Sequence, residues 1–365
     1  MRWAAVLVLV ACGRVHFTAA PHEPDAPQPD AAAQPCASDT DCGLCQRCDA
    51  TSHCQAIAID LLYLGHRSTC FLDSDGARWC AGDLVGWTLG APASRHAGDS
   101  AWTALYPGWS YYLGLHGNEL DAWSSTSTYE VSADTSWAQV SVETGPYCMR
   151  HAAGDAECNS TAIAGTWADL DGGDVGTCGV QIDGTLWCWG TENGNQLGLG
   201  VQPDGTVFAS PTQVGTATDW LVVHSGNGVT CAMKTDHTIW CTGSSGFTGT
   251  NGADTAGVMT RISPDTDWKW LDVRWQHGCA GKTDGRVLCW GWDDYAMIMP
   301  GASMSAPVPA ELTPGTTWDQ FLLGGHHYCG VPHGETRWWC WGYNNGGQLL
   351  DGTTTTRLAP APICM

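Results

Sequence analysis

The sequence predicts an all-β protein, a seven-bladed β-propeller preceded by a small cysteine-rich module. Three observations support this fold class. A tryptophan followed by two cysteines recurs along the chain, spaced Trp-x10-Cys-x9-Cys in four of five copies. A turn sequence such as Asp183-Gly184 lies between the two cysteines of several copies. The repeat is about 44 residues long, which is typical of a blade made of several short strands.

The repeat has seven copies, of which five are complete and two are degenerate. The complete copies begin at Trp137, Trp167, Trp220, Trp268 and Trp318. In the first degenerate copy, Cys70 and Cys80 keep their separation and Ile59 replaces the tryptophan. In the second, Trp102 is kept and both cysteines are lost. We expect the leading tryptophans to lie in the core, because large aromatic side chains are rarely left in water.

Each copy has the features of a β-hairpin stapled by a disulfide. Asp-Gly supplies the positive φ that a tight hairpin turn requires, and the flanking residues are rich in Val, Ile, Thr and Trp, as in strands. With a three-residue loop the two cysteines lie opposite each other, where disulfide geometry can be satisfied. We therefore expect six cross-strand disulfides: Cys70–Cys80, Cys148–Cys158, Cys178–Cys188, Cys231–Cys241, Cys279–Cys289 and Cys329–Cys340.

The ends of the chain suggest how the ring closes. A hydrophobic residue six positions before a repeat tryptophan indicates a preceding strand: Val131, Val214, Ile262 and Leu312. Residues 360–363 match this strand, but no tryptophan follows them. We expect the N- and C-terminal strands to pair as two halves of one blade, which would remove free sheet edges.

Two segments carry a known repeat motif. Residues 178–200 read CGVQIDGTLWCWGTENGNQLGLG, and residues 340–352 read CWGYNNGGQLLDG. They closely resemble the repeat of the regulator of chromosome condensation (RCC1-like) family, in its cysteine-paired bacterial lipoprotein form. The resemblance implies a seven-bladed propeller, in agreement with the number of copies. The chromatin role of the family's namesake does not follow for an exported, acidic chain.

The N-terminus predicts export and lipid anchoring. Residues 1–11 have the features of a lipoprotein signal peptide, with an apolar run too short to span a bilayer permanently. The run ends in LVAC, which resembles the bacterial lipobox and makes Cys12 the expected acylated residue. An ordinary signal peptide cut after Ala20 is the alternative. We expect the protein at the cell envelope, on the outer membrane or the outer face of the plasma membrane.

Two further segments precede the propeller, which we place at residues 57–365. Residues 12–35 hold the acylated cysteine and a Pro/Ala/Asp-rich linker, and residues 36–56 form a disulfide module. An even cysteine count requires Cys364 to pair with one cysteine of that module: Cys36, Cys42, Cys45, Cys48 or Cys54. A zinc site beside His53 is the alternative, but disulfides are favoured outside the cell, so we expect no metal.

Charge and motifs exclude several function classes. The formal net charge is −22, so phosphate backbones are repelled and nucleic acid is excluded as a partner. We expect membrane contact through the lipid anchor only. No nucleophile elbow, phosphate-binding glycine loop or zinc-protease helix is present. We therefore expect no catalytic residue, no cofactor and no enzymatic activity.

Four tryptophans that lie off the repeat positions are candidate binding residues: Trp109, Trp270, Trp275 and Trp292. Exposed aromatic side chains favour protein interfaces and sugar-binding surfaces, although blade packing would also explain them.

Histidines before the first cysteine of several copies would suit a metal or proton-transfer face: His66, His224, His277, His326 and His327. We favour hydrogen bonding within their own blades. Asp169, Asp171 and Asp174 lack the liganding Glu of a calcium loop, so we interpret them as solvated loop carboxylates.

The expected function is that of a monomeric, surface-anchored, non-enzymatic scaffold that presents the propeller to a protein or glycan partner. Two alternatives are an enzyme inhibitor of the β-lactamase-inhibitory-protein type and an extracellular polysaccharide-acting enzyme. Close carboxylates or a bound metal in the central funnel would favour the enzyme. A flat, aromatic-rich face without such a cluster would favour the binding scaffold.

Overall fold

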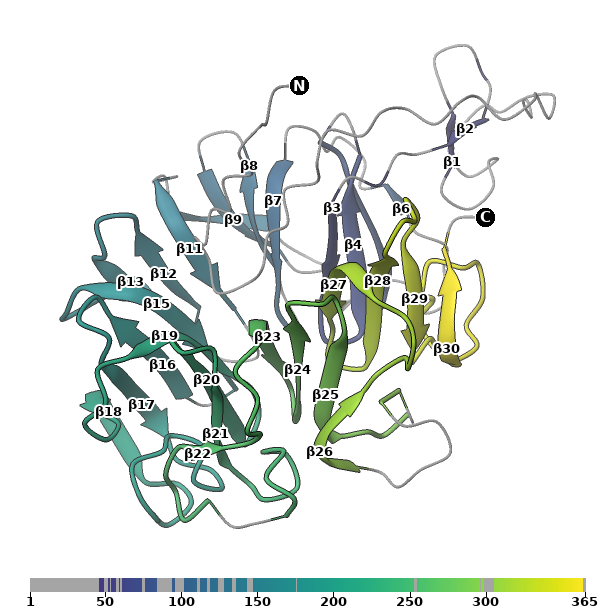
Figure 1. The fold of residues 1–365 in the computed structure, drawn as a ribbon. Coiled ribbons are helices and arrows are strands. Elements are labelled where there is room, and N and C mark those ends of the chain that lie inside the picture. Colours follow the sequence, from purple (N-terminus) through teal and green to yellow (C-terminus); the bar gives the residue numbers. More distant parts are fainter. Residues whose placement is uncertain are drawn as a thin grey trace, which may run out of the picture.

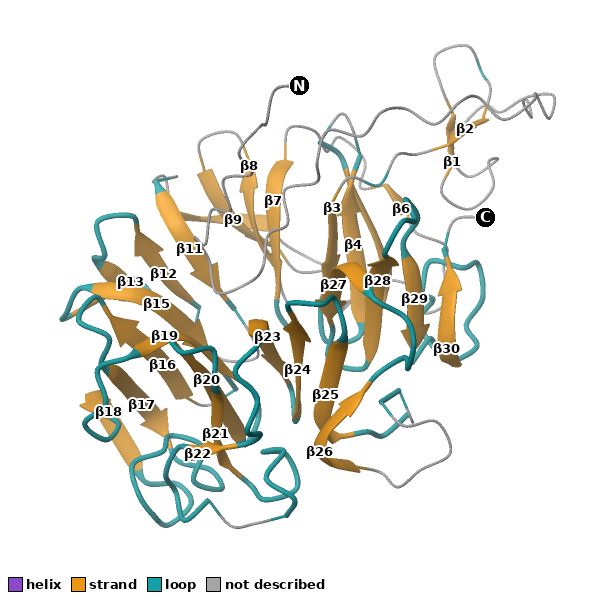
Figure 2. Cartoon of the chain, viewed as in Figure 1, coloured by secondary structure: helices purple, strands orange, loops and turns teal. Residues whose placement is uncertain are grey.

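The computed structural model describes residues 46–48, 52, 54–56, 59, 61–73, 76–83, 94–95, 102–109, 112–116, 119–123, 128–132, 136–142, 147–174, 176–252, 255–295, 297–298 and 305–363. Cys12, the linker over residues 12–35, Cys36, Cys42, Cys45 and Cys364 lie outside these residues. Every regular element among the described residues is a β-strand (Figure 2). None of the described segments is a helix long and apolar enough to cross a membrane.

Seven four-stranded antiparallel sheets form the blades of a propeller, as predicted, and each blade uses four consecutive strands (Figure 1). Blade 1 contains β3 (Leu61–Leu64), β4 (Ser68–Leu72), β5 (Arg78–Gly82) and β6 (Ser94–Arg95). Blade 2 contains β7 (Trp102–Pro107), β8 (Tyr112–His116), β9 (Glu119–Trp123) and β10 (Thr128–Ser132). Blade 3 contains β11 (Trp137–Ser141), β12 (Cys148–His151), β13 (Ala156–Cys158) and β14 (Thr161–Ile163).

The four remaining blades follow the same order. Blade 4 contains β15 (Trp167–Gly172), β16 (Gly176–Gln181), β17 (Leu186–Thr191) and β18 (Val207–Gln213). Blade 5 contains β19 (Trp220–Ser225), β20 (Val229–Lys234), β21 (Ile239–Gly243) and β22 (Thr260–Arg261). Blade 6 contains β23 (Trp268–Arg274), β24 (His277–Lys282), β25 (Val287–Trp292) and β26 (Ser305–Glu311). Blade 7 contains β27 (Trp318–Leu323), β28 (His327–Pro332), β29 (Trp339–Gly342) and β30 (Arg357–Pro362). A separate hairpin pairs β1 (Gln46–Cys48) with β2 (Cys54–Ala56).

The first strand of each blade forms the inner wall of the ring. In the second half of the ring, β15 contacts β19, β19 contacts β23, and β23 contacts β27. The leading tryptophans begin these strands, and Trp167 and Trp268 have no exposed surface. Trp137 is the exception, because it is only half-buried and stacks on His151 with ring centroids 3.9 Å apart. Four of the five leading tryptophans are therefore core residues, as expected.

All six predicted hairpin disulfides are present. In each, the two cysteines are direct partners across the second and third strands of the blade, for example Cys178 and Cys188. The turn of that hairpin requires glycine, because Gly184 has a φ of 80° and a Cβ there would lie 2.2 Å from the Thr218 carbonyl oxygen. Each disulfide closes a short loop, and so contributes less than about 3 kcal/mol in the chain-entropy treatment.

The predicted pairing of N- and C-terminal strands is wrong. β30 pairs with β29 of its own blade, and β6 completes blade 1 by pairing with β5. The strands that precede the repeat tryptophans, such as β18 and β26, are the outer strands of the preceding blade. The physical reason is local, because a chain that turns back after its third strand finds an antiparallel partner in that same strand.

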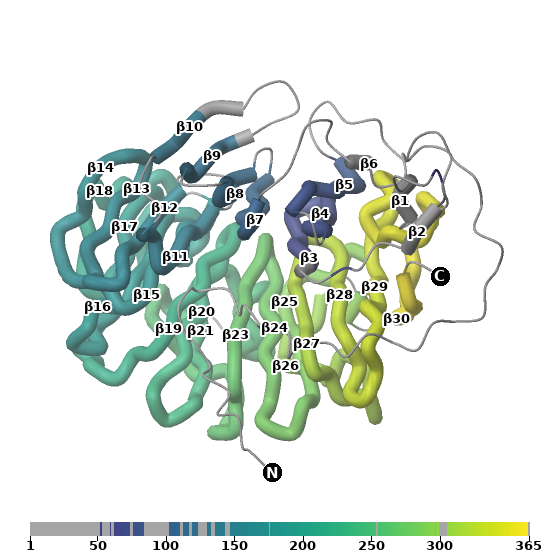
Figure 3. Tube along the Cα trace, turned by 90° about the horizontal axis from the view of Figure 1, so that it is seen from above, coloured from purple at the N-terminus to yellow at the C-terminus, as the bar shows by residue number. Residues whose placement is uncertain are grey.

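The ring closes through packing between blades 1 and 7, which lie side by side (Figures 1 and 3). This seam is one continuous apolar cluster: Leu62, Leu64, Phe71, Trp79 and Ala81 from blade 1, and Cys329, Val331, Trp338, Cys340, Leu349, Leu350 and Ile363 from blade 7. Hydrogen bonds between described residues of the two blades also cross it. Thr69 Oγ1 lies 2.7 Å from His327 Nε2, and the Gly325 amide donates to the Gly65 carbonyl at 3.1 Å. Hydrophobic burial is therefore the main force that closes the ring.

Several outer strands carry prolines. Pro211 lies in β18, Pro307 and Pro309 lie in β26, and Pro360 and Pro362 lie in β30. Proline has no backbone N–H, so it removes donors from an open sheet edge and discourages pairing with another chain. The rim of the propeller is thereby protected without any strand crossing between blades.

The seam predicts a strong stability effect at Phe71, which is fully buried within it. Phe71→Ala is expected to lower the free energy of unfolding by about 3–5 kcal/mol, because it leaves a cavity among large apolar side chains. Urea unfolding with the disulfides intact, followed by tryptophan fluorescence, measures this. Ile182 is 70% exposed, so Ile182→Ala is a control that should change stability by less than about 0.5 kcal/mol. An unchanged urea midpoint for Phe71→Ala would contradict closure by packing.

Candidate functional site

Two predicted tryptophans and two predicted histidines meet at one end of the inner strands. His66 lies between β3 and β4, Trp109 follows β7, Trp275 lies between β23 and β24, and His326 lies between β27 and β28. We call these four residues the axial cluster. They come from blades 1, 2, 6 and 7. Because blades 2 and 6 are not neighbours, Trp109 and Trp275 can touch only near the centre of the ring.

The rings of the axial cluster are in close contact. His66 stacks on Trp109 with centroids 3.7 Å apart and an interplanar angle of 14°. Trp275 is tilted against Trp109 at 4.7 Å, and the edge of the His326 ring meets His66 at 4.5 Å. The two histidines are buried, whereas Trp109 is 37% exposed. The cluster therefore has a rigid base and an aromatic surface that is open to solvent.

The backbone at Trp275 is strained. Its φ of 50° is a left-handed conformation, which costs a bulky residue about 1–3 kcal/mol and is concentrated at functional sites. Blade 5 holds it in place, because the Asn227 amide donates to the Trp275 carbonyl at 2.5 Å. A Cβ at Gly226 would lie 2.2 Å from that same carbonyl oxygen, so glycine is required there. Strand packing in two blades thus fixes the position of this indole.

Two tyrosines and an arginine extend the aromatic surface. Tyr295, after β25, meets His326 at 5.4 Å and Tyr343 at 4.7 Å between ring centroids. The Arg67 guanidinium lies over the Tyr343 ring, 5.3 Å from its centroid. Tyr295, Tyr343 and Arg67 are each half-buried. None of the three was predicted as a site residue. Two of them could have been noticed from their neighbours in the sequence, because Arg67 follows His66 and Tyr343 follows a repeat Cys-Trp-Gly.

Burial keeps the histidines of the axial cluster neutral. It lowers the pKa of His66 to about 2, with further lowering by His326 and Arg67. It lowers the pKa of His326 to about 4, and Arg67 adds to this effect. At neutral pH both imidazoles are therefore uncharged rings. Within the described part of the chain, the buried Nε2 atom of His66 has no hydrogen-bond partner.

Two of the other histidines join neighbouring blades. The His277 ring of blade 6 hydrogen-bonds to the backbone of Gly324 in blade 7. The His327 ring of blade 7 bonds to Thr69 of blade 1 through its Nε2 atom. Hydrogen bonding was predicted for these histidines, but within their own blades, and that detail is wrong. Burial lowers the pKa of each to about 3.

The other two candidate tryptophans lie outside the axial cluster. Trp270 stacks on Phe321 with centroids 5.9 Å apart and packs into the core between blades 6 and 7. Trp292 meets the ring of Phe247 edge-on at 6.1 Å. Both indoles are half-buried. Blade packing accounts for these contacts.

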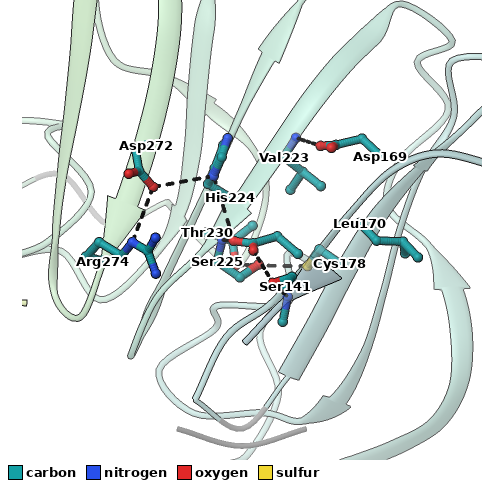
Figure 4. Close-up of polar contacts among 12 residues, drawn as sticks. Ser141, Asp169, Leu170, Cys178, Val223, His224, Ser225, Thr230, Asp272 and Arg274 are labelled. Carbon is teal, nitrogen blue, oxygen red and sulfur yellow. Dashed lines mark hydrogen bonds and ion pairs between the residues drawn. The ribbon is translucent and has the colours of Figure 1, made fainter. Parts of the chain in front are cut away.

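A polar network on the inner strands of blades 3 to 5 involves two of the predicted loop carboxylates (Figure 4). Asp169 accepts hydrogen bonds from the Val223 amide and from Gln139 Nε2, both at 2.8 Å. Asp171 accepts from the Ser225 amide at 2.8 Å and from the Ser141 hydroxyl at 2.5 Å. The interpretation of these carboxylates as solvated is wrong, because both are buried in β15 and tie blade 4 to its two neighbours.

The network continues through a histidine toward blade 6 (Figure 4). His224 Nδ1 lies 3.8 Å from Asp171 Oδ2 and 3.6 Å from Asp272 Oδ1, and Arg274 Nε lies 3.6 Å from the same Asp272 oxygen. Burial raises the pKa of the Asp171 carboxyl, and His224 partly opposes this. Asp174, in the loop after β15, accepts from Asn227 Nδ2 at 2.5 Å.

This network contains the close carboxylates that were expected to favour an enzyme. Both oxygens of Asp171 already accept hydrogen bonds from neighbouring blades, so they are occupied by structural donors. Among the described residues, no group of three histidine, cysteine, aspartate or glutamate side chains is arranged to hold a metal ion. The hydrogen bonds of this network therefore join neighbouring blades to one another.

No protein-family profile matches the chain. Two curated relatives are the human E3 ubiquitin-protein ligase HERC2, 28% identical over 203 residues, and the Arabidopsis thaliana ultraviolet-B receptor UVR8, 23% identical over 196 residues. These matches cover 53% and 52% of this chain, but 4% and 44% of the relatives. The chain thus spans less than half the length of each.

Solved structures with the same fold cover more of the chain. Prp20p from Saccharomyces cerevisiae, the yeast RCC1, aligns with a TM-score of 0.56 at 16% identity, over 84% of this chain and 77% of that one. Human WBSCR16 aligns with a TM-score of 0.52 at 15% identity, over 87% and 84%. At such identities the likeness concerns the fold.

His277 and His327 predict a loss of stability in acid. Their pKa values, about 3 in the folded protein, lie below the ordinary 6.5, so the unfolded chain binds more protons. Their contribution is complete above about pH 6.5 and is lost as the pH falls toward 3. Near pH 4.5 the two together should remove up to about 2.7 kcal/mol per pH unit. Urea unfolding between pH 7 and pH 4 measures this slope.

A variant isolates the histidine contribution from that of the carboxylates. The raised pKa of Asp171 acts in the opposite direction, but it is present in every variant and cancels in the difference. His277→Asn should make the pH slope shallower by about half of the joint effect. His333→Asn, at an exposed position, is the matched control. Equal slopes for His277→Asn and the unmodified protein would refute the assignment.

Proposed function

The chain carries an RCC1-like repeat propeller, and from this premise we propose that it is a non-enzymatic scaffold that binds a partner protein at the axial cluster. The observation that carries the proposal is the convergence of Trp109 and Trp275 from non-neighbouring blades onto one surface. Folding brings them together at the centre of the ring, where a partner could contact several blades at once.

The residue types at this surface support protein binding. Tryptophan, tyrosine and arginine are the side chains that dominate binding energy at protein interfaces, and here they occur together: Trp109, Trp275, Tyr295, Tyr343 and Arg67. Each indole and phenol adds contact area at a low cost in conformational entropy. Because the supporting rings are packed on buried histidines, little ordering is needed on association.

A non-catalytic role is supported by the chemistry of the central residues. The histidines of the axial cluster are neutral and lie among aromatic rings. The carboxylates of Asp169 and Asp171 hold blades together. A general base must lie within hydrogen-bond reach of the proton that it removes, and a nucleophilic side chain needs such a base beside it. The contacts that carry the axial cluster join aromatic and imidazole rings and include no such pair.

We further propose that the scaffold is held at the bacterial cell envelope as a monomer. Six hairpin disulfides are compatible with an extracellular location. The LVAC sequence supports acylation of Cys12, and residues 12–35 would serve as a spacer. Pairing of Cys364 with the module at residues 36–56 would tie the end of the chain to it. Non-reducing peptide mapping tests that pairing, and a free Cys364 thiol would contradict it.

Capture of the native partner tests the function. The propeller produced without its acyl group, with Trp109→Ala or Trp275→Ala, should retain less than about one tenth of the partner bound by the unmodified domain. Each form of the propeller is incubated with native envelope extract, and the bound material is identified by mass spectrometry. The same measurement would identify the bound material if it were a glycan.

The control is Trp292→Ala, which removes a half-buried indole outside the axial cluster. It should capture as much partner as the unmodified domain. Thermal midpoints of all variants show whether the fold is intact. Equal capture by Trp109→Ala, Trp275→Ala and the control would remove the axial cluster as the binding surface.

A further inference from the structure

Tryptophan rings in this propeller repeatedly lie against cationic side chains of their own or a neighbouring blade. The Arg78 guanidinium lies over Trp102 at 4.2 Å, and the Lys282 ammonium lies over Trp268 at 4.3 Å. Lys234 lies over Trp220 at 4.7 Å. A cation is attracted to the negative face of an indole ring, and the attraction is strongest for tryptophan. These blades therefore use cation–ring contacts as a regular part of their packing.

The tryptophans of the axial cluster differ from those rings. One face of Trp109 is stacked on His66, and 37% of the residue is exposed. The cation–ring contacts found in the described part of the chain involve neither Trp109 nor Trp275. An indole that is backed by a neutral ring and open to solvent is a suitable surface for a cation from outside.

The charges around the axial cluster allow a cation to approach. His66 and His326 are neutral at physiological pH because both are buried. The Arg67 guanidinium lies over the Tyr343 ring and not over Trp109. Burial, followed by the charge of Asp293, raises the pKa of the nearby Asp294 carboxyl, and the charge of Arg67 partly opposes this. The whole chain has a formal net charge of −22. A field of this sign concentrates cations and accelerates association with a basic partner.

We propose that the axial cluster receives a lysine or arginine side chain of a basic partner protein, which lies over the exposed surface of Trp109. The inference rests on the proposed function and adds the chemistry of the partner. Charge complementarity selects this occupant, because an acidic partner would be repelled by the chain as a whole. Its binding should weaken as salt is added, since part of the attraction is long-range.

Three synthetic peptides test the proposal on the full disulfide-bonded chain. They share one sequence with three variable positions, which are all lysine, all norleucine or all glutamate. Norleucine keeps the apolar stem of lysine and removes its charge. Binding is measured at pH 7 and 0.15 M salt by isothermal titration calorimetry. The lysine peptide should bind at least about fivefold more tightly than the norleucine peptide, and the glutamate peptide most weakly.

Two leucine variants separate the ring contact from general attraction to an acidic surface. Trp109→Leu keeps an apolar side chain and the net charge, so a loss of the lysine preference would be due to the missing indole face. Trp292→Leu removes an indole outside the cluster and should keep the preference. The proposal is overturned if the norleucine peptide binds as tightly as the lysine peptide, or if Trp109→Leu keeps the full preference.

The two experiments distinguish failure of this inference from failure of the proposed function. Loss of the native partner in Trp109→Ala, together with no lysine preference, would leave the binding surface in place and refute its basic ligand. Full capture by Trp109→Ala, together with no lysine preference, would refute both.

Discussion

Packing between neighbouring blades is the constraint on which the rest of this structure depends. Among the described residues, every blade is completed by its own four strands, so no pairing between strands joins one blade to the next. The ring persists because inner strands pack side by side and because a few polar side chains cross each boundary. Asp169, Asp171 and His327 are examples, and each has its partners in neighbouring blades. Removing water from these boundaries makes their hydrogen bonds costly to break.

This division between blades explains how the binding surface arises. Within blade 4, for example, a disulfide and a glycine-containing turn hold the second and third strands in register. The segments that follow the inner strands are therefore free to vary in sequence. They carry His66, Trp109, Trp275 and His326, which differ from copy to copy. A rigid ring thus presents unlike side chains from several blades at one place, as loops on stable scaffolds generally do.

Burial sets the chemical character of that surface. Imidazoles that would be partly charged in water are held neutral, so the axial cluster is an aromatic surface within a strongly acidic chain. The same burial makes His277 and His327 effective connectors between blades. His277 and His327, which occupy one repeated position, thereby stabilise the ring. The nearby His66 and His326 support the exposed aromatic surface at its centre.

The amino-acid sequence alone determined the blade count, through the number of repeat copies, and the six hairpin disulfides, through the cysteine spacing within a copy. It also proposed Trp109 and Trp275 as candidates, because they lie off the repeat positions. It predicted the wrong closure, because the sequence does not show whether the strand before a repeat tryptophan belongs to the following blade or, as in the structure, to the preceding one. It also misassigned Asp169 and Asp171, whose partners lie about 30 and 54 positions away. Only the tertiary structure decided which side chains meet across the ring, because those contacts depend on how distant blades pack and not on local periodicity.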